Sequence, residues 1–223
     1  MKIKTEIEIV TGFLGSGKTT FINSLVKNSL VTGEIVLILQ CETGEKALYI
    51  EEGLKNKIII KEQDASKALS SAYIKQMINF YSPHRIIIEH NGMKSLGEVL
   101  SVFNFELEHL CLEPTVYHIT DAVTFDMFFY NMREIIEPFI YHSNLIIINN
   151  SSMLEDKAKK SLVKRLETLN QGAFIICLDS INDIDSKLKK ADILQDKLIK
   201  SFKMALRDKL PHAWEMRLRR KKV

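Results

Sequence analysis

The chain alternates short apolar runs with longer segments in which apolar residues recur at helical spacing. Seven short runs rich in β-branched residues predict strands over residues 6–11, 34–40, 57–61, 85–89, 115–120, 144–149 and 173–178. Several are continuously apolar, such as Ile86-Ile87-Ile88, which is typical of strands buried on both faces of a parallel sheet. Helical periods follow the first strand, cover 125–140 as one long stripe, and cover 154–169. Strands that alternate with helices predict an α/β fold with a three-layer, doubly wound and mostly parallel sheet of about six to seven strands.

A glycine-rich segment follows the first predicted strand. The run Gly12-Phe13-Leu14-Gly15-Ser16-Gly17-Lys18-Thr19 fits the pattern G-x-x-x-x-G-K-[ST] between a strand and a helix. Its glycines permit positive φ, so successive N–H groups and the positive end of the helix can face an anion. Lys18 would reach the β- and γ-phosphates of a nucleotide, and the Thr19 hydroxyl would ligate Mg²⁺. The expected fold is therefore that of a P-loop NTPase, an enzyme that hydrolyses nucleoside triphosphates.

Two other predicted strands end in polar residues, at the sheet edge where ligands bind in a doubly wound fold. Glu89 ends the fourth strand, and we expect it to hold Mg²⁺ through water, with the Gly92 N–H close to the γ-phosphate. Glu42 follows the second strand and either faces the nucleotide or its metal or belongs to a surface loop. The predicted catalytic residues are thus Lys18, Thr19 and Glu89, the last two also as metal ligands.

The phosphate loop and three other segments resemble one known family. Residues 11–20, TGFLGSGKTT, are similar to the loop of the CobW-like branch of the metallochaperone GTPases, a group that includes UreG and HypB. The family's Glu-x-x-Gly is matched by residues 89–92, its acidic segment after the second strand by 41–45, and its Asp-Ala strand end by 121–122. The resemblance implies Mg²⁺-dependent binding and hydrolysis of GTP. It also implies that nucleotide is bound by Gly12, Gly15, Ser16, Gly17, Lys18, Thr19, Thr20, Glu42, Gly92 and Asn149.

This chain departs from the family's base-reading motif, Asn-Lys-x-Asp. The corresponding segment is Asn149-Asn150-Ser151-Ser152, which keeps the Asn and replaces the Asp by Ser152. A neutral hydroxyl cannot accept two hydrogen bonds from guanine as a carboxylate does. The sequence therefore leaves the choice between GTP and ATP open.

Two further departures concern metal binding and length. The CobW branch carries Cys-x-Cys-Cys after its third strand, whereas residues 61–66 contain no cysteine. Glu62 and Asp64 could offer oxygen ligands to a harder ion, although a polar loop is the simpler interpretation. CobW-like proteins usually have a second, C-terminal domain. Here we expect a nucleotide-binding domain over 1–191 and a C-terminal helix with a basic tail over 192–223, a layout closer to that of UreG or HypB.

Composition and charge limit the class of protein, its cellular location and its partners. The 223 residues are 46 % apolar and 26 % charged, which excludes a disordered chain. Three separated cysteines indicate a reducing compartment, and neither a secretion signal nor a membrane span is evident, so we expect a cytoplasmic protein. The net charge is +3, but residues 197–223 contain ten Lys or Arg and two acids. A basic tail can contact nucleic acid, an anionic membrane or an acidic partner. We favour a solvated terminus and do not expect nucleic acid.

Three functional hypotheses follow. In the first, the chain is an accessory GTPase that helps to load a metal or cofactor into a client enzyme and, as the resemblance implies, dimerises when it holds nucleotide. In the second, it is a regulatory or scaffold module that binds nucleotide with little turnover. In the third, it is an ATPase or small-molecule kinase with an altered base pocket. Phosphate release from GTP and ATP distinguishes these hypotheses.

Overall fold

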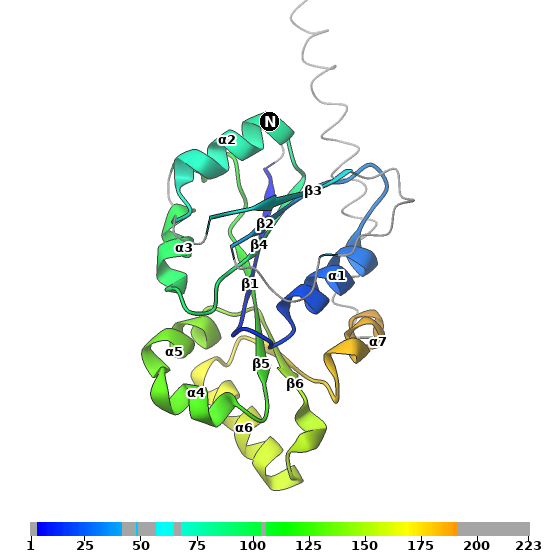
Figure 1. Cartoon of the computed structure of the whole chain (residues 1–223), viewed down its shortest axis with the longest axis vertical. Helices are drawn as coiled ribbons and strands as arrows, with labels where there is room; N and C mark the ends of the chain where they lie inside the picture. Colours follow the sequence, from blue (N-terminus) through cyan, green and yellow to red (C-terminus); the bar gives the residue numbers. More distant parts are fainter. Residues whose placement is uncertain (1–3, 42–47, 49–56, 65–67, 104–105, 191–223) are drawn as a thin grey trace, which may run out of the picture.

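A computed structural model describes residues 4–41, 48, 57–64, 68–103 and 106–190. Glu42 and the predicted C-terminal helix and tail lie outside these ranges, so the domain boundary at 191 stays a prediction. The described residues form a seven-stranded sheet in the order β3-β2-β4-β1-β5-β6-β7, in which every strand pair is parallel (Figure 1). The strands are β1 (Glu6–Thr11), β2 (Ile35–Gln40), β3 (Lys57–Glu62), β4 (Arg85–Glu89), β5 (Thr115–Asp121), β6 (Leu145–Asn149) and β7 (Phe174–Cys177).

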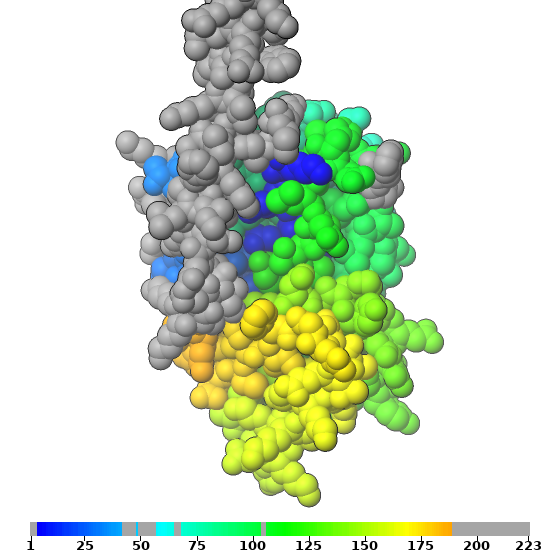
Figure 2. Space-filling view, turned by 180° about the vertical axis from the view of Figure 1, so that it is seen from behind, coloured from blue at the N-terminus to red at the C-terminus, as the bar shows by residue number. Residues whose placement is uncertain are grey.

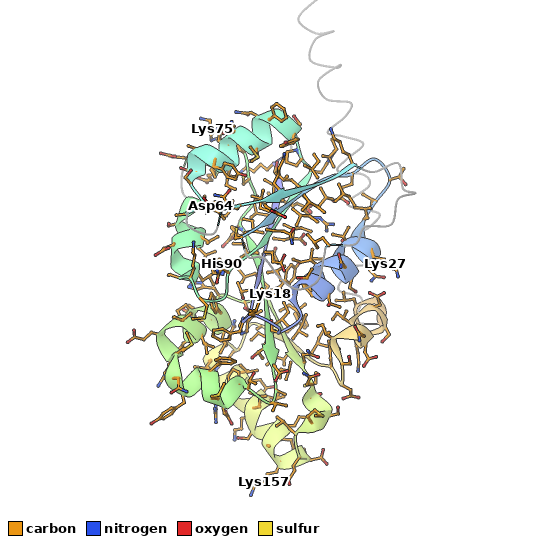
Figure 3. All side chains as sticks on the ribbon, in the orientation of Figure 1. Lys18, Lys27, Asp64, Lys75, His90 and Lys157 are labelled. Atoms are coloured by element: carbon orange, nitrogen blue, oxygen red, sulfur yellow. The ribbon has the colours of Figure 1, made fainter. Side chains whose placement is uncertain are left out.

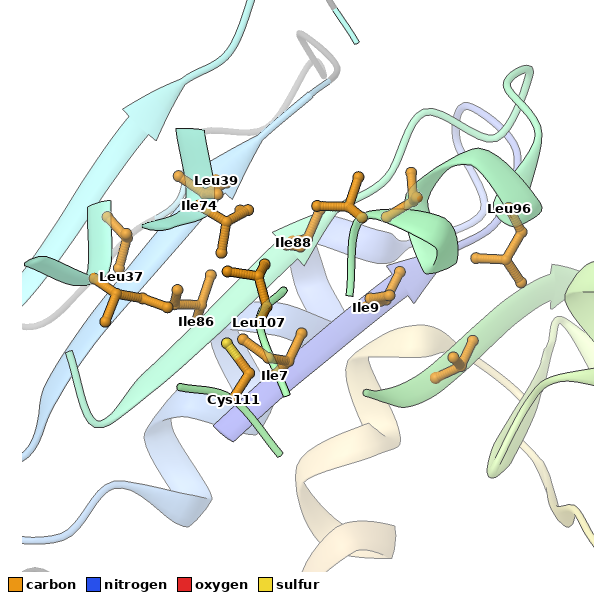
Figure 4. Packing of buried hydrophobic residues seen from close by; sticks show 14 of the residues in the cluster. Ile7, Ile9, Leu37, Leu39, Ile74, Ile86, Ile88, Leu96, Leu107 and Cys111 are labelled. Carbon is orange, nitrogen blue, oxygen red and sulfur yellow. The ribbon is translucent and has the colours of Figure 1, made fainter. Parts of the chain in front are cut away.

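All seven predicted strands therefore form, and the continuous apolar runs lie where both faces of the sheet are covered. β4 and β6 are buried along their whole length. In β4 the side chains of Ile86 and Ile88 enter one core cluster and that of Ile87 enters another, because successive side chains of a strand point to opposite faces. Figure 4 shows Ile86 and Ile88 packed with neighbours from β1, β2 and α2.

Helices cover both faces of the sheet, which confirms the doubly wound, three-layer fold (Figure 1). One face packs α1 and α7, and the other packs the remaining helices. Seen from behind, the yellow surface of the segment that leads into β7 adjoins the orange surface of α7 (Figure 2). The helices are α1 (Lys18–Ser29), α2 (Ser71–Tyr81), α3 (Leu96–Val102), α4 (Phe125–Asn131), α5 (Arg133–Tyr141), α6 (Asp156–Leu169) and α7 (Ile184–Lys190).

The long apolar stripe over 125–140 is two helices rather than one. The backbone breaks at Met132, whose φ of −136° and ψ of 37° lie outside the helical region. Phe125 of α4 and Ile136 of α5 still enter the same core cluster. Apolar spacing thus reports which side chains are buried, and it does not report whether the backbone between them is continuous.

A buried ionic network lies at the amino ends of the strands, opposite the phosphate loop. The Arg85 side chain is 1 % exposed, and its Nε lies 3.4 Å from Glu8 Oε2 and 3.5 Å from Glu34 Oε1. Its Nη1 donates to Ser29 Oγ at 2.7 Å, and the Tyr117 hydroxyl donates to Glu8 at 3.0 Å. Burial lowers the pKa of Arg85, but the two carboxylates outweigh it and the pKa rises. The guanidinium therefore stays charged and joins β1, β4, β5 and α1.

Candidate functional site

The glycine-rich segment forms a tight loop between the carboxyl end of β1 and the start of α1. Gly12 has φ 144° and Gly17 has φ 109°, values that side-chain-bearing residues rarely adopt. A Cβ on Gly12 would lie 2.3 Å from Ile119 O, and one on Gly17 would lie 2.7 Å from Ile181 Cγ1. Gly15 lies exposed on this loop. Both the backbone conformation and the close packing therefore require glycine at positions 12 and 17.

Lys18 and Ser16 place polar atoms inside this loop. Lys18 is 5 % exposed, and its Nζ donates to Gly12 O at 2.8 Å and Phe13 O at 3.0 Å. Ser16 Oγ is buried and has no hydrogen-bond partner among the described residues. A buried hydroxyl without a partner and an ammonium that donates to backbone carbonyls are groups with which a bound phosphate could form hydrogen bonds. The loop, with Thr20 half-buried in the first turn of α1, thus fits an anionic ligand.

Glu89 meets the start of α1 at the carboxyl end of β4. Thr19 Oγ1 donates to Glu89 Oε1 at 2.6 Å, and Gln40 Nε2 donates to Glu89 Oε2 at 3.0 Å. Glu89 is 3 % exposed, so two neighbouring side chains fix its carboxylate in a largely dry position. A hydroxyl and a carboxylate are hard oxygen donors, which suit Mg²⁺. Since Mg²⁺ usually keeps waters and ligand phosphates in its shell, these two protein groups fit such an ion.

Gly92 lies against the phosphate loop, backbone to backbone. A Cβ added at Gly92 would be 2.2 Å from Gly12 O and 3.0 Å from Phe13 Cα. The turn that carries it is closed by the Met93 N–H, which donates to Asn91 Oδ1 at 2.9 Å. The structure therefore brings Gly92 and the phosphate loop together.

Asn149 also reaches the loop, but through the loop's own backbone. Its Nδ2 donates to Ser16 O at 3.3 Å, and its Oδ1 accepts from the Asn150 N–H at 2.8 Å. Asn150 adopts a left-handed conformation with φ 55°, and its side-chain amide donates to Asp121. Ser152 is exposed at the surface of this turn.

Two buried histidines beside the loop were not predicted. Burial and the nearby Lys18 ammonium lower the pKa of His118 to about 3, and burial is also the main cause that lowers the pKa of His90 to about 4. His118 Nδ1 lies 2.9 Å from Thr11 Oγ1, and the Phe139 ring lies 5.6 Å from the His90 ring and 5.7 Å from that of His118. Figure 3 shows Lys18 and His90 close together. Both imidazoles are neutral near pH 7 and add no second cation beside the lysine.

The other sequence candidates lie apart from these residues. Glu62 and Asp64 are exposed at the end of β3, an edge strand separated from β1 by β2 and β4. Within the described ranges, no group of three or more His, Cys, Asp or Glu has the geometry of a metal site. Among the helices in those ranges, none has the length and apolar character of a membrane span.

Comparison with known proteins identifies one family. The profile of the CobW/HypB/UreG nucleotide-binding domain matches residues 6–177. No curated protein matches the sequence.

Solved structures share the fold at low identity. The Zn(II)-bound YjiA GTPase from E. coli is 19 % identical with a TM-score of 0.57, over 78 % of this chain and 57 % of that chain. HypB from Helicobacter pylori in complex with nickel is 16 % identical with a TM-score of 0.52, over 86 % of this chain and 87 % of that one. The chain thus spans a little more than half the length of YjiA and most of HypB.

Proposed function

Because the chain belongs to the CobW/HypB/UreG family of nucleotide-binding domains, we propose that it binds and hydrolyses GTP with Mg²⁺. The observation that carries the proposal is the 2.6 Å hydrogen bond between Thr19 Oγ1 and Glu89 Oε1 beside the glycine-rich loop. A hydroxyl and a buried carboxylate held together beside this loop support a Mg²⁺ site next to the phosphates of a nucleotide. The names of the relatives, a GTPase with zinc and HypB with nickel, support guanine and a metal cargo.

Each residue of this site then has a distinct role. Lys18 exchanges its hydrogen bonds to the carbonyls of Gly12 and Phe13 for phosphate oxygens and stabilises their negative charge. Thr19 and Glu89 hold Mg²⁺, which when bound neutralises charge on the β- and γ-phosphates. The N–H of Gly92 faces the γ-phosphate, so that the presence of this group is transmitted to the segment that follows β4.

The biological role we propose is that of a cytoplasmic accessory switch for metal or cofactor delivery to a client enzyme. Exposed apolar side chains close to the phosphate loop support a partner that docks there. Leu14 is 66 % exposed, Met93 57 % and Met127 54 %. Met93 follows Gly92, and Met127 precedes Phe128, whose ring stacks on Phe13 at 4.4 Å. A second copy of the chain or the client would cover these side chains when nucleotide is bound.

The first experiment measures phosphate release from GTP and from ATP, with and without Mg²⁺. We expect release from GTP that requires Mg²⁺ and disappears in Lys18→Ala. Lys27→Ala is the matched control, because Lys27 lies on the same helix and pairs with Asp185 at the surface. Faster release from ATP would contradict the guanine assignment. Tight binding without release from either nucleotide would favour a regulatory module.

The docking proposal has its own test. Light scattering measures the mass of the protein with Mg²⁺ and a non-hydrolysable GTP analogue, alone and with candidate client enzymes. We expect Met127→Asp to prevent the nucleotide-dependent association. Phe80→Asp is the control, since Phe80 is 76 % exposed on α2, away from the phosphate loop. Equal association of both variants would contradict a docking surface at the loop.

A further inference from the structure

The residues around the phosphate loop divide into two groups. On the β4 side, Glu89 contacts Thr19, and Gly92 lies against Gly12. On the other side, the loops that follow β6 and β7 reach the junction of the loop with α1. Asn149 donates to Ser16 O, and the Ile181 side chain packs where a Gly17 Cβ would be. If the metal and the γ-phosphate lie on the β4 side, as proposed above, the nucleoside extends toward the loops after β6 and β7.

Those two loops are joined to each other. The Ser151 N–H donates to Leu178 O at 2.8 Å, and the Leu178 N–H donates to Ile148 O at 2.8 Å. The next residue along the chain is Asp179, whose Oδ1 lies 3.5 Å from the Ser151 hydroxyl. The loop after β7 thus brings a carboxylate to the segment 149–152, in which the expected carboxylate is replaced by Ser152.

Two other acids near this segment, Asp121 and Asp183, already accept hydrogen bonds from the protein. Asp121 uses Oδ1 for two backbone N–H groups of the turn that follows it, and its Oδ2 accepts from the Asn150 amide. Asp183 closes its own turn by accepting from the Ser180 N–H at 3.2 Å. Asp179 is exposed, and within the described ranges its carboxylate accepts from the Ser151 hydroxyl alone. Its carboxylate therefore has capacity to accept hydrogen bonds from a ligand.

We propose that Asp179 reads the guanine base, so that this chain carries the base-reading carboxylate on the loop after β7 rather than at position 152. The inference rests on the proposed function, binding of a nucleoside triphosphate by the phosphate loop. Guanine presents two adjacent donors, N1–H and the 2-amino group, and a carboxylate accepts from both. Adenine presents an unprotonated N1 at the same edge, so the same carboxylate disfavours ATP.

The test is a calorimetric titration of the whole chain with GTP, ITP, XTP and ATP in the presence of Mg²⁺. The wild type should bind GTP most tightly, and ITP less tightly because inosine lacks the 2-amino group. Asp179→Asn should weaken GTP binding about 10- to 100-fold. The same variant should bind XTP more tightly than the wild type does, because an amide accepts from N1–H and donates to the 2-carbonyl of xanthine. A loss of structure would not produce this gain.

Asp156→Asn is the matched control, since it removes an equal charge from the exposed first turn of α6 and should leave all four affinities unchanged. A wild type that prefers GTP, with Asp179→Asn indistinguishable from Asp156→Asn, would overturn the assignment and leave the proposed function standing. Equal weakening of all four nucleotides by Asp179→Asn would also overturn it. A wild type that binds none of the four would refute the proposed function and this inference with it.

Discussion

Replacing Arg85 by Met tests how much the buried ionic network contributes to stability. Met fills a similar volume but removes the guanidinium that lies beside Glu8 and Glu34, of which Glu34 is 0 % exposed. Removal of one partner from a buried ion pair costs about 3–5 kcal/mol, because an uncompensated charge stays in the interior. With a urea slope of about 2 kcal/mol per molar, the midpoint of unfolding should fall by about 1.5 to 2.5 M. Equilibrium unfolding followed by circular dichroism, without nucleotide, measures this shift.

Arg133→Met is the matched control for this prediction. Arg133 lies 2.7 Å from Glu137, closer than Arg85 lies to either of its carboxylates, but its side chain is 63 % exposed. If burial determines how much an ion pair contributes to the free energy of unfolding, Arg133→Met should leave the urea midpoint essentially unchanged. Adding Glu8→Gln and Glu34→Gln to Arg85→Met should restore part of the lost stability, since the charges of these two carboxylates are then removed as well. Equal shifts for Arg85→Met and Arg133→Met would refute the reasoning.

Three further predictions concern the site. Gly92→Ala should abolish nucleotide binding in a calorimetric titration, because the new Cβ would lie 2.2 Å from Gly12 O. Gly97→Ala should leave binding unchanged, because its Cβ would lie 3.5 Å from the Ser95 hydroxyl, an ordinary contact distance. Glu89→Gln should raise the Mg²⁺ concentration for half-maximal phosphate release about 10- to 100-fold, and an unchanged requirement would exclude Glu89 from the metal site. Since burial lowers the pKa of His118 from 6.5 to about 3, the unfolded chain takes up a proton first as the pH falls. The wild type should therefore lose about 2 kcal/mol more of its free energy of unfolding between pH 7 and pH 5 than His118→Gln does. Urea midpoints of both proteins at the two pH values measure this difference.

The strands and the phosphate loop could be predicted from the sequence because each is determined by a short segment of the chain. Each strand is a local apolar run, and the phosphate loop is a contiguous pattern, so both can be recognised without knowledge of the rest of the chain. The break at Met132 was missed because the apolar spacing continues across it.

The contacts that shape the site join residues far apart in the sequence, which is why sequence analysis found only some of them. Glu89 was recognised from its place at a strand end, whereas its contact with Gln40 depends on β2 lying next to β4. His118 sits within an apolar strand with no motif around it. Asp179 became a candidate only when the loops after β6 and β7 were seen to be joined.

Strand β4 begins at Arg85 and ends at Glu89, so the contacts of Arg85 affect the position of Glu89 in the site. β1 and β4 pair in register from Glu6 with Arg85 to Val10 with Glu89. A slip of two residues would keep every side chain on its own face but move Glu89 by about 7 Å relative to the phosphate loop. The same slip would pull the Arg85 guanidinium away from Glu8. The ionic network at the amino ends of the strands thus fixes the register of β4 against β1. Through that register it also fixes the position of Glu89 relative to Thr19.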